Sequence, residues 1–405
     1  METNIKSQKE YLPPPEAPGV IKWIKDNLFG SLLNSILSVL SLAIIYFMVV
    51  GAANWILFTA DWSPITEGPL LYVIGQYPRE DMWRVGIALS LVVLMIGISW
   101  GKWGGLIKSI SFAVMIIFLI AALLPVSHPQ LSVGMRLYLA GNIVVALVGF
   151  LIGRIKGLKT QVIAAAWLLT PILVVVLFSG FEGSEGFRKI ATTSWGGLMV
   201  TFLLAVGGIL LSFPLGVILA LGRRSKLPVV KAFATIYIET IRGVPLITIL
   251  FMFSIILALF LPQETRLDRL LRALMAMIVF SSAYTAENVR GGLQAVPQGQ
   301  IEAAKALGMN SFKIMGLIVL PQAIRAVIPA IVGQFISLFK DTTLVVIIGI
   351  NDLLGIGKSI INSSPEFVQL QTEVYIFIAV IYWAFSYLMS LASRRIEGAL
   401  GVGER

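Results

Sequence analysis

The segment NVRGGLQAVPQGQIEAAKALGMNSFKIMGLIVLPQAIR, residues 288–325, is a polar interruption between very apolar stretches. Pro297 can open a short helix, since the N–H that it lacks would have no partner in a first helical turn. Gly308 is typical of a left-handed helix stop, and Asn310 or Ser311 can cap a second helix. We therefore predict two short helices at about a right angle, in a connection whose size is usually a sign of function.

Glu302, Ala303 and Ala304 lie in the first of these predicted helices. The two alanines would give the helix a face with little side chain, so that another protein can approach closely. Glu302 supplies one charge that can pair with a basic partner. A solvated amphipathic loop is the other interpretation of the same residue types.

The composition is that of an all-α integral membrane protein. Of 405 residues, 57% are hydrophobic and 13% charged, whereas soluble domains carry about 25% charged residues. The chain has no cysteine and a single histidine, His128, which argues against a metal centre or a histidine-based catalytic site. The net charge of +10 is scattered between apolar runs, so it predicts membrane topology and not nucleic-acid binding.

Charge-free runs long enough to cross a bilayer predict about ten transmembrane helices. They cover residues 31–60, 85–101, 109–126, 137–153, 160–181, 190–222, 243–261, 273–286, 326–339 and 375–393. Residues 342–350 are too short to span and are expected to continue the preceding helix. The run at 31–60 is longer than a signal-peptide core, so we interpret it as a retained first span. A short interfacial helix is expected around residues 20–28.

The basic residues predict the orientation. With the N-terminus inside, the inner segments hold about twice as many Lys and Arg as the outer ones, which places both termini and residues 288–325 in the cytoplasm. The predicted organisation is a cytoplasmic tail (1–30), an extension of about five spans (31–189) and a five-span core (190–400). We see no clear internal repeat, which argues against a secondary carrier.

The spacing of Glu302-Ala303-Ala304, Gly308 and Pro321 resembles the EAA motif of ABC-importer permeases. The resemblance extends to its polar amino acid (histidine/glutamine-type) branch, on the residues around Glu239 and on the run from Lys340 to Thr342. The long N-terminal extension makes the chain most similar to the general L-amino acid permeases. The likeness covers about residues 190–400.

This resemblance implies the permease core of a type I importer that carries amino acids across the inner (cytoplasmic) membrane. The loop would dock on a dimer of ATP-binding subunits, which bind ATP and Mg, so this chain would hold no cofactor and be no enzyme. A second permease subunit, expected to form a heterodimer with this one, and a periplasmic amino-acid-binding protein would complete the assembly. Residues 355–359 look like the end of a phosphate loop, but Asp352 replaces its first glycine. An ion-coupled secondary amino acid transporter is the alternative.

Two charged pairs stand out as candidate sites. Glu239 and Arg242 are three residues apart at the inner end of a span, where they can form a structural ion pair. Lys340 and Asp341 lie deep in a predicted helix, and such charges normally face a cavity or a partner. One hypothesis is a substrate path formed by Lys340 and Asp341 with Gln334, Ser337, Thr342 and Tyr284. A tie to the partner permease, or exposure at the outer interface, is the alternative.

Overall fold

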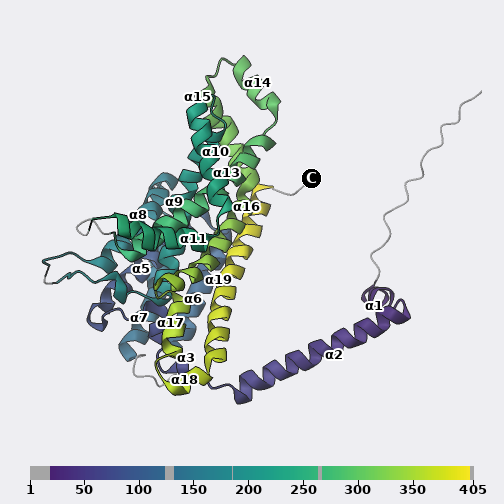
Figure 1. Ribbon diagram of the computed structural model, residues 1–405, viewed down its shortest axis with the longest axis vertical. Helices are drawn as coiled ribbons and strands as arrows, with labels where there is room; N and C mark the ends of the chain where they lie inside the picture. The colour runs from purple at the N-terminus through teal and green to yellow at the C-terminus, as the bar shows by residue number, and fades with distance from the viewer. Residues whose placement is uncertain (1–18, 124–131, 185, 263–266, 402–405) are drawn as a thin grey trace, which may run out of the picture. The chain divides into compact units, whose positions relative to one another are not determined.

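The computed structural model describes residues 19–123, 132–184, 186–262 and 267–401. Every regular element in these ranges is a helix (Figure 1). In chain order they are α1 (Val20–Leu28), α2 (Leu32–Asn54), η1 (Trp55–Thr59), α3 (Ser63–Thr66), α4 (Pro69–Ile74), η2 (Arg79–Asp81), α5 (Met82–Trp103), α6 (Gly105–Leu123), α7 (Val133–Gly153), α8 (Thr160–Ser179), η3 (Thr192–Ser194), α9 (Gly197–Arg223), α10 (Pro228–Gly243), α11 (Leu246–Phe251), η4 (Met252–Ile256), α12 (Leu257–Phe260), α13 (Arg269–Ala295), α14 (Gln298–Ala306), α15 (Ser311–Ile314), η6 (Met315–Val319), α16 (Leu320–Asp341), η7 (Thr342–Ile348), α17 (Leu353–Ile361), α18 (Pro365–Gln369) and α19 (Gln371–Leu400).

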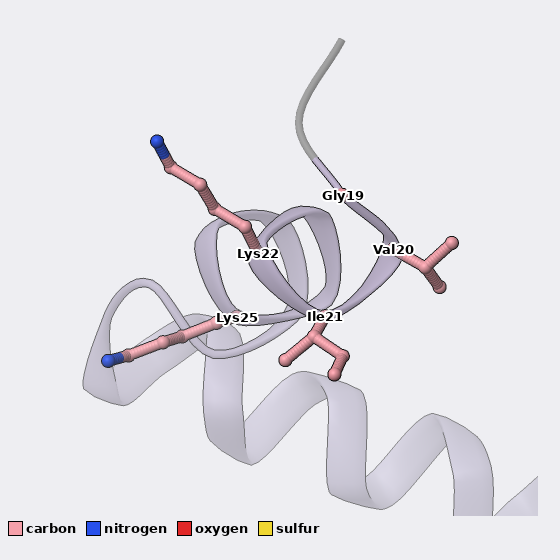
Figure 2. Close-up of a pocket in the computed structure, with 5 residues that line it drawn as sticks. All are labelled: Gly19, Val20, Ile21, Lys22 and Lys25. Carbon is pink, nitrogen blue, oxygen red and sulfur yellow. The ribbon is translucent and has the colours of Figure 1, made fainter.

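The chain divides into two units after Asp61. In the first, the predicted interfacial helix forms as α1, and the rest of the predicted tail, residues 1–18, lies outside the described residues. The Lys22 and Lys25 side chains leave α1 on one side while Val20 and Ile21 point away from them (Figure 2). This separation of charged and apolar side chains suits a helix that lies along a membrane surface.

The expected number of about ten spans is confirmed. Among the described residues, nine helices are long and apolar enough to cross a membrane, and a bent pair brings the number to ten. The bent pair joins α10 to α11–α12 at 107°. Pro245 has no N–H to continue the helix and holds Val244 in extended backbone. The span expected at residues 243–261 is therefore the second arm, and α10 is a separate amphipathic helix.

The prediction of two short helices within residues 288–325 is wrong for the second one. Only α14 is short, because the helix that starts at Ser311 continues without a break to Ile348, over 38 residues. Its turn widens to a π-helix, η6, which ends two residues before Pro321. A widened turn accommodates a proline that can neither donate a backbone bond nor fit its ring in a regular turn. As expected, the chain beyond Asp341 continues as a helix, the tighter η7.

Helices α5 and α7 pack through glycines on both sides. A Cβ atom on Gly97 would lie 2.3 Å from the carbonyl oxygen of Ala146, and one on Gly149 would lie 2.5 Å from that of Leu94. These backbones are thus close enough to exclude side chains, as in membrane helix pairs with small residues four apart. The contact holds the first bundle, α5 to α8, together.

The second bundle contains α9, α13, α16 and α19; α9, α13 and α16 pack against one another, and α19 packs against α16. Helices α14 and α15 lie at one end of the unit, while α17 and α18 lie at the opposite end (Figure 1). At that opposite end α4 packs against α9 and α17. A Cβ on Gly75 would come 2.5 Å from the Cα of Gly196, so residues before α5 contact the start of α9 directly.

Candidate functional site

Helix α14 has defined ends on both sides. Pro297 precedes its first residue in extended backbone, as its fixed φ favours. At the other end the Gly308 N–H donates to the Lys305 carbonyl over 2.9 Å, and Gly308 has a φ of +74°, the left-handed conformation expected of it. Asn310 then caps the next helix by accepting the Lys313 N–H at 2.9 Å. The loop is thus a fixed shape and not a flexible connection.

The two alanines of the predicted docking face point in different directions. Glu302 and Ala303 are exposed, whereas Ala304 is only 2% exposed and packs in the apolar cluster beneath α14. The expectation that Ala304 belongs to the outward face is therefore wrong; neighbours on a helix point about 100° apart, and Ala304 seats the helix. The outward surface instead carries Leu307 and Phe312, which are 81% and 87% exposed.

The cluster beneath α14 joins it to two long helices, α13 and α16. Its buried members include Leu293 and Val296 from the end of α13, and Val319 and Ala323 from η6 and α16. At Gly292 the two helices approach so closely that a Cβ would lie 2.3 Å from the Ala323 carbonyl oxygen. A force on α14 would therefore reach α13 and α16 through this cluster.

An ion network lies close to this end, on α9, α10 and α13. Glu287 contacts three guanidinium groups, those of Arg290 at 2.5 Å, Arg223 at 3.4 Å and Arg242 at 3.7 Å. Arg223 also contacts Glu239 at 2.6 Å. Glu239 and Arg242 thus have their ion-pair partners on other helices, and the pair predicted between them is not the contact that forms. The bend after Gly243 brings α10 against α13, which no local spacing reveals.

Tyr284 lies beside this network and not beside Lys340. Its ring is 5.6 Å from the Arg242 guanidinium carbon and stacks at an angle on Phe280, with ring centroids 4.8 Å apart. These contacts fix the tyrosine where α10 meets α13. The hypothesis of a substrate path placed Tyr284 with residues of α16, but the sequence shows only that it lies near the end of the preceding helix and does not show which residues it contacts.

A second polar cluster is buried at the end opposite to α14. The Thr342 hydroxyl donates to the Phe339 carbonyl at 2.7 Å and lies 3.2 Å from the Tyr382 hydroxyl. Tyr382 donates to Asp352 at 3.0 Å, and Asp352 accepts the Gly355 N–H at 2.8 Å as the cap of α17. Burial raises the pKa of the Asp352 carboxyl to about 6. Thr342 thus belongs to a closed buried network.

The remaining residues of the predicted path lie on the surface of α16. Ser337 and Lys340 are exposed, and Gln334 and Asp341 are partly buried. Within the described ranges no hydrogen bond or ion pair engages these four side chains. Gln334, Ser337 and Asp341 are spaced i, i+3, i+7 and so share one helix face. No polar contact from the described part of the chain occupies this face.

Comparison with known proteins shows which family this chain belongs to. Residues 212–401 match the family described as "binding-protein-dependent transport system inner membrane component". The chain is 34% identical to the inner membrane amino-acid ABC transporter permease protein YhdY of Escherichia coli (strain K12), covering 94% of this chain and 93% of that protein. It belongs to the amino acid ABC transporter permeases.

Two further relatives agree. The glutamate/glutamine/aspartate/asparagine transport system permease protein BztC of Rhodobacter capsulatus is 33% identical, over 96% of this chain and 97% of that protein. The probable glutamine ABC transporter permease protein GlnP of Bacillus subtilis (strain 168) is 37% identical over 50% of this chain and 91% of its own length. This shorter relative matches about half of the present chain.

The chain is therefore a multi-pass inner-membrane permease subunit of an ABC amino acid importer. Such a permease works with an ATPase and a binding protein, and it is the ATPase that binds ATP. It is a transport component and not an enzyme, and it has no cofactor of its own. The alternative of an ion-coupled secondary transporter is excluded by this membership.

Proposed function

We propose that α14 is the cytoplasmic helix through which the ATPase drives this permease. The observation that carries the proposal is that Ala304 of α14 packs in one buried cluster with residues of α13 and α16, while Leu307, directly after α14, and Phe312 of α15 are exposed. Exposed apolar side chains on a short helix with fixed ends are typical of a protein-binding surface. Closure of the ATPase dimer would then move α14 and, through the buried cluster, the two long helices.

The proposal is tested by changing the charge and the shape of the exposed side chains at and beside α14. Glu302→Lys and Phe312→Asp are expected to abolish uptake and to reduce recovery of the ATPase with the permease. Glu302→Gln and Phe312→Leu are the matched controls, since they keep shape or apolar area and should retain most activity. Full uptake by Glu302→Lys and Phe312→Asp would show that the coupling contact lies elsewhere.

We propose that both termini and α14 face the cytoplasm, as the distribution of Lys and Arg indicates. The chain has no cysteine, so single cysteines report sidedness without background. An impermeant maleimide applied to intact spheroplasts is expected to label Lys358→Cys, on the predicted outer side, and to spare Glu302→Cys until the membrane is opened. The reverse pattern would overturn the orientation.

A second permease subunit is expected to complete the pore as a heterodimer. One stripe of α10 supports this, since Val229, Phe233 and Ile236 share a helix face and are 79%, 67% and 66% exposed. Such a stripe needs a lipid or protein partner. Copies with two different tags should not be recovered together from cells, while a related permease chain of different mass should be. Recovery of both tags in one complex would indicate a homodimer.

The face of α16 that carries Gln334, Ser337 and Asp341, with Lys340 beside it, is our proposed wall of the amino acid path. Lys340→Ala and Asp341→Ala should each lower the maximal uptake rate while assembly with the ATPase stays normal. Uptake unchanged in both variants would assign these residues to the partner contact or the outer interface.

The division into an extension (31–189) and a transport core (190–400) also remains a proposal. Its support is that shorter relatives match only about half of this chain. The contact of α4 with α9 suggests that the extension buttresses the core. A chain lacking residues 31–189 should lose stability more than substrate selectivity; loss of selectivity alone would contradict a buttressing role.

A further inference from the structure

A pocket of 420 Å³ lies beside the start of α13. Its walls come from the bent span, from α13 and from η7, and its lining includes Ser254, Leu259, Arg269, Arg272, Ile347 and Ile348. Since α13 runs 27 residues from Arg269 to Ala295, the pocket is about 40 Å along that helix from α14, at 1.5 Å per residue. Its volume falls within the range of about 300–1,000 Å³ usual for small-molecule sites.

Arg272 lines the pocket, and not all of its N–H donors are used in hydrogen bonds. One of its terminal nitrogens donates to the Ser254 carbonyl of η4, while its buried Nε has no hydrogen-bond partner among the described residues. Arg269 donates to the Gly349 carbonyl at 3.3 Å, at the end of η7. Each guanidinium has five N–H groups, so the two arginines hold the walls in place and retain donors for a ligand.

Ser254 adds a second unsatisfied group. Ser254 is one of the residues that line the pocket, it is only 8% exposed, and its buried hydroxyl has no partner among the described residues. A buried hydroxyl without a partner is unusual in a folded protein and calls for a ligand, a water or an ion. Two such groups, on Ser254 and Arg272, meet at one pocket.

The described part of the pocket lining is positive, because Arg269 and Arg272 are cations and none of the described lining residues carries a carboxylate. The adjacent acid in the described chain, Asp268, is engaged as the cap of α13, accepting the Leu270 N–H at 2.8 Å, and by the Thr192 hydroxyl. Guanidinium groups match carboxylates with two parallel hydrogen bonds, so the ligand class that fits is a carboxylate.

We infer that this pocket receives the carboxylate of the amino acid that enters from the side opposite to α14, and that its two arginines disfavour cationic amino acids. The inference rests on the proposed function, since it needs α14 to face the cytoplasm. It places a selectivity site on this subunit, separate from the exposed face of α16. The hydroxyl of Ser254 would donate to the same carboxylate.

The test uses the assembled transporter in nanodiscs, without its binding protein, and radiolabelled L-glutamate as the probe. Arg272→Gln and Ser254→Val are expected to weaken glutamate binding, the arginine variant by roughly tenfold, the loss of one charge-assisted hydrogen bond. Excess L-lysine should compete poorly with glutamate in the wild type and better in an Arg269→Gln/Arg272→Gln variant. Arg79→Gln, which removes an exposed cation outside the pocket, is the control.

Two further measurements distinguish ligand binding from a folding defect and from the binding of a lipid phosphate. Arg272→Lys keeps the charge and should retain part of the binding, which guards against a folding defect, as does recovery of the ATPase with each variant. Nanodiscs of phosphatidylcholine alone and with phosphatidylglycerol test whether a lipid phosphate is the anion. The inference is overturned if wild type binds no glutamate, if the variants bind it unchanged, or if their defect follows lipid composition. The proposed function fails separately, if Glu302→Lys and Phe312→Asp support full uptake.

Discussion

Replacing Glu287 by glutamine removes the only carboxylate that contacts Arg223, Arg242 and Arg290 together in the described ion network. Its side chain is 23% exposed. A hydrogen bond to a charged group contributes about 1.5–3 kcal/mol, and Glu287 accepts two from Arg290, at 2.9 and 2.5 Å. Repulsion among the remaining cations adds to the loss, and partial exposure screens it. We expect a cost of about 2–4 kcal/mol in stability.

The measurement is thermal unfolding of the purified importer in nanodiscs, followed by the fluorescence of a label on this chain. For a region of about 150–250 residues each kcal/mol shifts the midpoint by about 2–4 °C, so Glu287→Gln should unfold several degrees lower. ATP hydrolysis by the assembled complex should also become less dependent on substrate-loaded binding protein, because α9, α10 and α13 no longer move together.

Glu239→Gln is the matched control. That carboxylate contacts Arg223 alone and is 55% exposed, so its ion pair is worth about 0–1 kcal/mol. The double variant Glu287→Gln/Arg290→Gln should recover part of the loss, since it removes a cation left without a partner. If Glu287→Gln unfolds like wild type, or if Glu239→Gln is equally damaging, the central role assigned to Glu287 is incorrect.

Three further outcomes are expected. Burial raises the pKa of Asp352 from an ordinary 3.8 to about 6 in the folded protein, so the native state binds the proton more tightly than the unfolded state does. Lowering the pH from 7 to 5 should therefore add about 1 kcal/mol of stability to the wild type and none to Asp352→Asn. Unfolding midpoints measured at the two pH values would show the difference. Ala304→Leu should overpack the cluster beneath α14 by about 1–3 kcal/mol and speed hydrogen exchange in α14, whereas Ala303→Leu should leave exchange unchanged. Gly149→Ala should lower the unfolding midpoint because its Cβ meets a backbone oxygen, while Gly141→Ala, with nothing within 4 Å, should not; equal midpoints would contradict the close packing of α5 and α7.

The sequence was sufficient for features with a local cause. Charge-free length predicts spans because a bilayer tolerates only internally bonded backbone, and the stop at Gly308 follows from the left-handed conformation that glycine adopts without a Cβ. The spacing from Glu302 to Pro321 predicted the family, since it depends on residue types at fixed separations.

Partners across helices could not be predicted in the same way. Glu239 and Arg242 satisfy the spacing for a pair, yet the turn of 107° after Gly243 places each against another helix. Ala303 and Ala304 have the same side chain, and only the packing of α14 shows that one is exposed and the other buried.

By itself, then, the sequence determined that this chain is a membrane-embedded helical permease with a short helix in the polar segment 288–325. It could do so because hydrophobic length, turn chemistry and motif spacing depend only on the order of residues along the chain. Only the tertiary structure decided which charges meet at Glu287, which buried hydroxyl near Arg272 has no partner among the described residues, and which side chains of α14 are exposed. Those depend on bends and crossings between helices far apart in the chain, where a rotation of 100° exchanges a buried side chain for an exposed one.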